Sequence, residues 1–116
     1  MVFQRLFNYG RTTDGDGEVT PAEARRRVVD GAQLIDVREP SEWAAGHAPG
    51  AMHVPLGRLS RALDSLPRDR DLLFICASGS RSRTAMSLAR RAGLARAWSV
   101  SGGMGAWARA GFPVER

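Results

Sequence analysis

The chain has 116 residues, of which 43% are apolar and 25% charged, and this length and composition suffice for one globular domain. The sequence contains no uncharged apolar run of the roughly 18 residues that a membrane span requires. One Cys and two His exclude an intramolecular disulfide and a cysteine-based metal cluster, so we expect no metal and no cofactor, and a reducing cytoplasm as the location. The net charge is +5, and it is unevenly distributed: residues 1–75 carry −1, whereas residues 76–116, with 7 Arg and a single acidic residue, Glu115, carry +6. This excess favours an anionic ligand, an acidic partner or nucleic acid.

Residues 1–18 include the run TTDGDGE, which predicts a flexible N-terminal lead-in, and they lack the long apolar region of a secretory signal. The domain itself is expected over residues 19–116. It opens with TPAE, in which Thr20 is placed to cap a helix, Pro21 stands at the first helical position and Glu23 follows three residues past the cap. This pattern predicts a short helix directly after the lead-in.

Strand and helix patterns alternate in the middle of the chain. The run QLIDV at 33–37 predicts a buried strand, residues 41–45 predict a short helix, and MHVP at 52–55 predicts a brief extended piece. Leucines then recur at spacings of three or four over residues 56–66, which is the pattern of an amphipathic helix.

The second half continues the alternation. The uninterrupted apolar run DLLFIC at 71–76 is typical of a strand buried on both sides in a parallel sheet. A helix is predicted over 81–92 with Gly93 at its end, then a strand in ARAWSV at 95–100 and a last short helix in MGAWARA at 104–110. The order predicts an α/β fold with a mainly parallel central sheet flanked by helices on both faces.

Cys76 lies at the carboxyl end of the predicted central strand, where binding sites form in open parallel sheets. The four residues that follow are all small: Ala77, Ser78, Gly79 and Ser80. Such a loop lets several backbone N–H groups converge on an anion, and the next helix directs the positive end of its dipole to the same point. With Arg81 as a further donor, this setting lowers the pKa of a thiol and makes it a nucleophile. The alternative is a buried, small apolar residue that ends a strand.

The run CASGSR resembles the active-site loop of the rhodanese (thiosulfate sulfurtransferase) family. LIDVREPSEWAAGHAPGAMHVP is similar to that family's Asp-Val-Arg strand end, Gly-His corner and Gly-Ala before a short strand. SVSGGMGAWARAGFPV is similar to its closing strand, Gly-Gly turn, Trp-bearing helix and Gly-x-Pro ending. Together these motifs cover residues 19–114.

The resemblance implies a single-domain rhodanese-like fold in which Cys76 takes a sulfane sulfur as a persulfide, held with the anionic donor by the backbone N–H groups of residues 77–81 and the Arg81 side chain. Sulfur would pass by two-step covalent catalysis from a donor such as thiosulfate to cyanide or a thiol, including that of a redox or sulfur-acceptor protein. The alternative is a sulfur-carrier or interaction module that exchanges persulfide sulfur with partner proteins without turning over small molecules. Neither reading needs a membrane. The Arg run at 24–28 lacks interleaved aromatics, so no nucleic-acid partner is expected.

Loop length and composition refine this reading. Dual-specificity phosphatases of the same fold place five residues between Cys and Arg, whereas four separate Cys76 from Arg81, which suits one sulfur atom better than a tetrahedral phosphate. Many family loops carry a cationic or large polar residue where Ala77 stands, which weakens the case for thiosulfate as the physiological donor. Arg83 has two readings: it supplies the missing charge from the first helical turn, or it is a solvated helix residue.

Asp36 ends a predicted strand at the same sheet edge as Cys76. It either hydrogen-bonds the active loop and supports it, or caps its own turn through the backbone. Other polar residues nearby are expected to be structural: Arg38, Glu39 and Glu42 as an ion-pair group, and His47 and His53 as corner residues held by backbone contacts.

Overall fold

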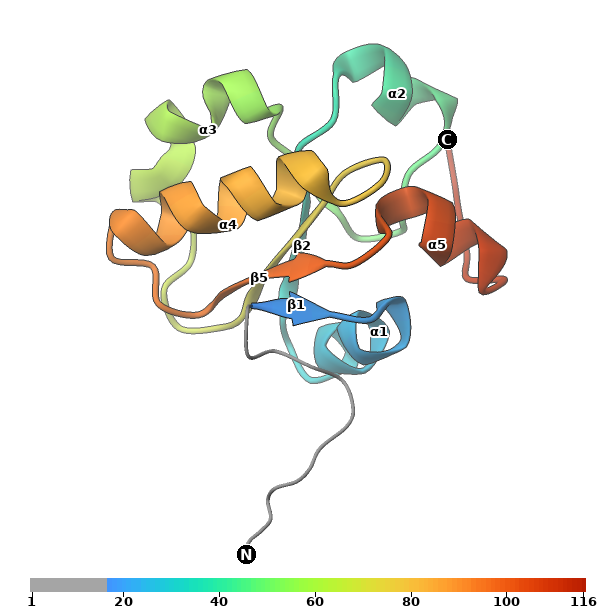
Figure 1. Ribbon diagram of the computed structural model, residues 1–116, viewed down its shortest axis with the longest axis horizontal. Helices are drawn as coiled ribbons and strands as arrows, with labels where there is room; N and C mark the ends of the chain where they lie inside the picture. Colours follow the sequence, from blue (N-terminus) through green and yellow to red (C-terminus); the bar gives the residue numbers. More distant parts are fainter. Residues whose placement is uncertain (1–16) are drawn as a thin grey trace, which may run out of the picture.

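Five strands form one sheet in which every neighbouring pair is parallel, in the order β1-β5-β4-β2-β3. The computed structural model describes residues 17–116 (Figure 1). The strands are β1 (Glu18–Val19), β2 (Gln33–Asp36), β3 (Met52–His53), β4 (Leu72–Ile75) and β5 (Ala97–Val100). The α/β fold with a parallel central sheet is therefore confirmed.

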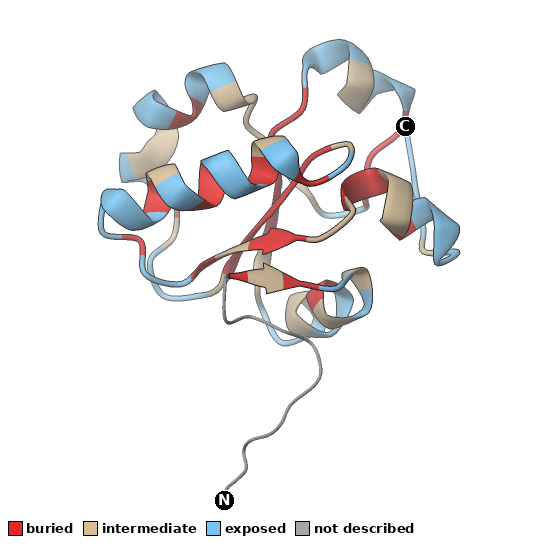
Figure 2. Ribbon diagram, viewed as in Figure 1, coloured by how far each residue is buried: buried red, intermediate tan, exposed pale blue. Residues whose placement is uncertain are grey.

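The helices lie on both faces of this sheet. They are α1 (Pro21–Val29), α2 (Pro40–Ala45), α3 (Leu56–Ala62), the 3-10 turn η1 (Leu63–Ser65), α4 (Ser80–Arg91) and α5 (Gly103–Arg109). Alternate residues of β4 point to opposite faces, so that Phe74 packs with residues of α3 and α4 and Leu73 with residues of α1 and α5. Figure 2 shows the resulting burial along the strands and on the inward sides of the helices. All of β4 is buried, as its uninterrupted apolar run predicts.

Most predicted boundaries agree with the structure to within one or two residues. The Oγ1 of Thr20 accepts a hydrogen bond from the Glu23 backbone N–H at 3.1 Å, so the expected helix cap is present. The helix expected over 56–66 is shorter, because α3 stops at Ala62 and a 3-10 turn follows. Pro67 accounts for the extended backbone of Leu66, which ends the 3-10 turn, since a proline disfavours helical backbone in the residue before it.

The N-terminal boundary differs from the prediction by one residue. Glu18, which was predicted to belong to the lead-in, is the first residue of β1 and pairs with Ser99 of β5. Residues 1–16 lie outside the described part of the chain. A two-residue edge strand is too short to produce a recognisable alternation of apolar and polar residues. No helix within residues 17–116 is long and apolar enough to cross a membrane.

Candidate active site

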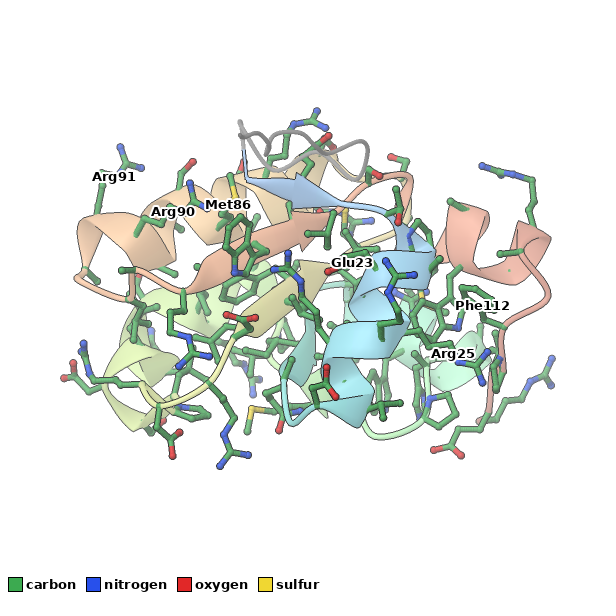
Figure 3. All side chains as sticks on the ribbon, turned by 90° about the horizontal axis from the view of Figure 1, so that it is seen from below. Glu23, Arg25, Met86, Arg90, Arg91 and Phe112 are labelled. Carbon is green, nitrogen blue, oxygen red and sulfur yellow. The ribbon has the colours of Figure 1, made fainter. Side chains whose placement is uncertain are left out.

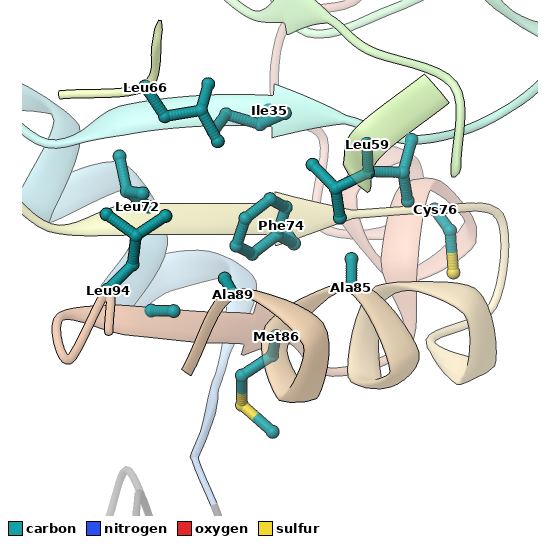
Figure 4. Packing of buried hydrophobic residues seen from close by; sticks show 12 residues of the cluster. Ile35, Leu59, Leu66, Leu72, Phe74, Cys76, Ala85, Met86, Ala89 and Leu94 are labelled. Atoms are coloured by element: carbon teal, nitrogen blue, oxygen red, sulfur yellow. The ribbon is translucent and has the colours of Figure 1, made fainter. Parts of the chain in front are cut away.

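Cys76 directly follows β4 and is fully buried. Figure 4 shows it beyond Phe74 at the end of the strand, beside the first turn of α4. Its Sγ accepts hydrogen bonds from the backbone N–H groups of Gly79 at 3.1 Å and Ser82 at 3.3 Å. Gly79 has a φ of 114°, in the left-handed region that favours glycine, and this conformation turns the chain back toward the sulfur. The N–H group of Gly79 in the loop and that of Ser82 in the first turn of α4 thus converge on one atom, and Ser82 lies beyond the predicted residues 77–81.

The pKa of the Cys76 thiol is below its ordinary value, as the balance of opposing influences. Burial is the largest single influence and raises the pKa, because it disfavours the charged form. Hydrogen bonds from the Ser82 side chain and backbone, and from the backbone N–H groups of Gly79 and Ser78, stabilise the thiolate and together outweigh burial. The site therefore favours a nucleophilic sulfur.

Ser82 is a component that the sequence analysis missed. Its Oγ lies 3.6 Å from Cys76 Sγ, 3.0 Å from the Gly79 carbonyl oxygen and 2.7 Å from the Oγ of Ser99 on β5. Both serines are fully buried. When the sulfur is a thiol it donates to Ser82 Oγ, whereas a thiolate accepts the Ser82 hydroxyl proton. The position of Ser82 in the first turn of the predicted helix, where backbone N–H groups are free, was the available signal.

Arg81 is held by a carboxylate from another element. Its Nη1 and Nη2 donate to the two carboxylate oxygens of Glu42 on α2, at 2.8 and 2.9 Å. The hydrogen bonds from Arg81 are the main reason that the pKa of Glu42 falls to about 2, and the same contact raises the pKa of Arg81. The negative charge of Cys76 also raises the pKa of Arg81, to a smaller extent.

The prediction that Arg38, Glu39 and Glu42 form ion pairs with one another was therefore wrong. Glu42 pairs across the fold with Arg81, and the Arg38 guanidinium pairs with Asp36. The side chains of Glu39 and Glu42 instead form a capping box at the start of α2. The error arose because these residues are close in the chain, while the partner of Glu42 is 39 positions away.

Asp36 caps its own turn. It is fully buried and accepts hydrogen bonds from the Arg38 backbone N–H at 3.0 Å and from the Arg38 Nη2 at 2.8 Å. Arg38 Nη2 also donates to the Gly46 carbonyl at 2.7 Å. These contacts correspond to the second reading of Asp36, and they fix both ends of the segment that carries Glu42.

Arg83 lies at the rim of the loop. Its Nη1 donates to Glu18 on β1 at 3.0 Å, and 55% of its side chain is exposed. A Cβ placed on Gly79 would lie 3.6 Å from the same nitrogen, so the guanidinium is a neighbour of the loop. Arg83 is thus near the site, but its positive charge is already paired with the Glu18 carboxylate.

The first turn of α5 holds the loop from the other side. The backbone N–H groups of Met104 and Gly105 donate to the carbonyls of Cys76 and Ala77, at 2.7 and 3.1 Å. A Cβ on Gly103 would lie 2.3 Å from the Cys76 carbonyl oxygen, and its φ is +57°. A side chain at Gly103 would therefore collide with the loop that carries the cysteine.

The two histidines occupy structural positions. The indole of Trp43 stacks against His47 at 3.5 Å and against His53 at 4.7 Å between ring centroids. A ring nitrogen of His47 lies 2.9 Å from the Trp43 carbonyl, and one of His53 lies 2.8 Å from the Arg38 carbonyl. Both are corner residues held by the backbone, as expected. Residues 17–116 contain no group of three or more His, Cys, Asp or Glu side chains that could hold a metal ion.

Comparisons with known proteins agree with this geometry. Residues 20–110 match the Rhodanese-like domain family. The chain is 37% identical over 99 residues to a sulfurtransferase of Allochromatium vinosum, covering 84% of this chain and 92% of that protein. It is 31% identical to the thiosulfate sulfurtransferase GlpE of Actinobacillus pleuropneumoniae, with the same coverage. A rhodanese-related protein from Thermoplasma volcanium has a similar structure, with a TM-score of 0.78 and 30% identity over 84% of this chain and 96% of that one. The chain belongs to the rhodanese-like domain family.

Proposed function

We propose that the protein is a sulfurtransferase in which Cys76 carries a sulfane sulfur as a persulfide. The observation that carries this proposal is the Cys76 Sγ at the N-terminus of α4, where it accepts hydrogen bonds from the backbone N–H groups of Gly79 and Ser82. The same donors that favour a thiolate would hold a persulfide. Relatives named as sulfurtransferases, one of them a thiosulfate sulfurtransferase, support the assignment.

The proposed reaction has two displacement steps at sulfur. The Cys76 thiolate attacks the outer sulfur of a donor such as thiosulfate, a bond forms between Sγ and that sulfur, and the donor's S–S bond breaks with its electron pair leaving on sulfite. Cyanide or a thiolate then attacks the outer sulfur of the persulfide, and the electron pair of the Sγ–S bond returns to Cys76. This is covalent catalysis in which the chain ends as it began.

Within this reaction the loop residues have distinct proposed roles. The backbone of Ala77, Ser78, Gly79 and Ser80 surrounds the transferred sulfur. Arg81, fixed by Glu42, closes the loop after only four intervening residues, which favours one sulfur atom over a phosphate group. The proposal needs no metal or organic cofactor, and a reducing compartment such as the cytoplasm would keep Cys76 available.

A second candidate is a sulfur carrier that exchanges persulfide sulfur with partner proteins. The observation that favours it is that Cys76 has no exposed surface, so the loop has to shift before a donor sulfur can reach Sγ. A protein partner that docks on the loop could drive this shift with its binding energy, whereas a small donor offers little contact.

Steady-state kinetics separates the two candidates. An enzyme for small donors should turn over thiosulfate and cyanide continuously, and Cys76→Ser should abolish this turnover because a hydroxyl cannot form a persulfide. A carrier should show negligible turnover with small molecules but rapid transfer from a persulfidated protein. Turnover that persists in Cys76→Ser would contradict both candidates.

A further inference from the structure

Three arginines lie along the loop or the turn beside it, and each faces a carboxylate. The pairs are Arg81 with Glu42, Arg83 with Glu18 and Arg38 with Asp36. The first pair is bidentate and half-buried, and Glu42 stays ionised down to a pKa of about 2, so it is charged at every physiological pH. These three arginine–carboxylate pairs therefore add no net charge around the loop.

Most of the arginine excess of residues 76–116 lies elsewhere in the fold. Arg90 and Arg91 belong to the last turn of α4, at the end of the helix opposite the loop. Arg91 projects from the molecule there (Figure 3), whereas Arg90 lies over the Trp98 ring and donates to the Ala97 carbonyl. At 1.5 Å per residue they stand about 15 Å along the helix from Ser80, beyond the roughly 8 Å over which exposed charges act at physiological salt. Arg96 pairs with Asp71. Arg109, in the last turn of α5, is the exception: a Cβ on Gly105 would lie 3.3 Å from its Nη1 and 3.5 Å from the Ala77 carbonyl oxygen, so this guanidinium is a neighbour of the loop. The electropositive half predicted from the sequence does not concentrate its charge at Cys76.

The positive groups in direct contact with the sulfur are backbone dipoles. The N–H groups of Gly79 and Ser82 at the start of α4 amount to about half a positive charge. This offsets about half of the negative charge of one thiolate. With thiosulfate, a dianion, the donor and the thiolate together carry three negative charges. With a hydropersulfide, R–S–SH, donor and thiolate together carry one negative charge, or two when the hydropersulfide is ionised.

From this charge balance we infer that Glu42 determines donor specificity: by neutralising Arg81 it directs Cys76 toward alkyl hydropersulfides and against thiosulfate. The inference rests on the proposed sulfurtransferase function. In the preferred first step the Cys76 thiolate attacks the outer sulfur of R–S–SH, the Sγ–S bond forms, and the donor S–S bond breaks with its electron pair leaving as R–S⁻. The proton stays on the transferred sulfur. Glu42 acts through Arg81 and touches no reacting atom in this step.

The experiment measures single-turnover loading of Cys76 by intact mass, with thiosulfate, cysteine hydropersulfide and persulfidated serum albumin as donors. The wild-type chain should load faster from at least one of the two persulfides than from thiosulfate, and the two persulfides distinguish a small source from a protein source. Glu42→Gln frees the charge of Arg81 and should raise the thiosulfate rate roughly tenfold, while cysteine hydropersulfide loading changes less than about threefold. Glu42→Asp should behave as the wild type.

Glu39→Gln is the matched control, because it removes the same charge from the same helix start while leaving the Arg81–Glu42 contact in place. Because the Glu39 charge acts on Arg81 far more weakly than the Glu42 contact does, this variant should change the ratio of the thiosulfate and hydropersulfide rates much less than Glu42→Gln. Salt gives a second readout on the wild-type chain, which needs no substituted protein to fold. A site without net positive charge should not slow its thiosulfate loading as NaCl is raised, whereas a positive site would slow it markedly.

Distinct outcomes overturn the inference and the proposed function. Faster wild-type loading from thiosulfate than from both persulfides, an unchanged donor ratio in Glu42→Gln, or thiosulfate loading that slows with salt would each refute the role of Glu42 and leave the persulfide chemistry intact. If none of the donors loads Cys76, the proposed function itself is wrong.

Discussion

Removal of the Ser82 hydroxyl tests how the fold activates its cysteine. In Ser82→Ala the Sγ loses the donor at 3.6 Å but keeps the backbone N–H groups of Gly79 and Ser82. A hydrogen bond to a charged group contributes about 1.5–3 kcal/mol, and the long separation places this one at the lower end. Since about 1.4 kcal/mol corresponds to one pKa unit, the pKa of Cys76 should rise by about one unit. The sign follows because the lost donor stabilises the thiolate.

The assay is the rate of iodoacetamide alkylation against pH, which reports a single group because Cys76 is the only cysteine. Ser80→Ala is the matched control, since it deletes an exposed hydroxyl in the same helical turn and should leave the midpoint unchanged. Ser99→Ala should give a smaller rise than Ser82→Ala, because Ser99 contacts Ser82 rather than the sulfur. Chemical denaturation of each variant checks that the loop is still folded.

A midpoint that stays at the wild-type value in Ser82→Ala would refute this reasoning. The backbone donors alone would then account for the lowered pKa of Cys76, and the buried Ser82–Ser99 pair would be a packing feature. A wild-type midpoint at or above about 8.5 would go further, because the loop would then not activate its cysteine at all.

Three further predictions concern the surroundings of the loop. Arg81→Ala should fold but load sulfur from thiosulfate at least about tenfold more slowly, since it removes a charge-assisted donor and leaves Glu42 uncompensated; unchanged loading kinetics would show that the backbone suffices. Because the pKa of Glu42 is lowered from 4.5 to about 2, its ionised form stabilises the fold above pH 4.5 and this stabilisation is lost as the pH falls toward 2. The difference in unfolding free energy between wild type and Glu42→Gln should therefore shrink over that window in urea titrations, and a constant difference would contradict the pairing. Gly103→Ala should lower the unfolding free energy by roughly 1–3 kcal/mol and slow loading, because its Cβ would strike the Cys76 carbonyl, whereas Gly57→Ala, with no atom within 4 Å, should do neither.

The elements that follow local rules could be predicted from the sequence. The central strand is evident because four consecutive apolar residues, Leu72 to Ile75, face helices on both sides. The start of α1 is evident because Thr20, Pro21 and Glu23 form a helix-start pattern within four residues. The position of Cys76 between a strand and a helix could be predicted for the same reason, because both neighbouring elements have clear local sequence patterns.

The charge arrangement of the site could not be predicted in this way. The contact between Arg81 and Glu42 joins residues 39 positions apart, and that between Ser82 and Ser99 joins residues 17 apart, so each depends on how the elements pack. Charge counted along the chain indicated an electropositive half, whereas the fold brings carboxylates from β1, β2 and α2 to the arginines around the loop. The place of Glu18 in a strand could not be predicted for a related reason, because β1 forms only by pairing with β5, which is distant in the sequence.

The most direct test of the central claim is the intact mass of the chain after incubation with a sulfane-sulfur donor. A persulfide on Cys76 predicts an adduct of about +32 Da that disappears on addition of cyanide and is absent from Cys76→Ser. No adduct with thiosulfate or with either persulfide donor, or an adduct that persists in Cys76→Ser, would contradict the assignment of Cys76 as the sulfur-carrying residue.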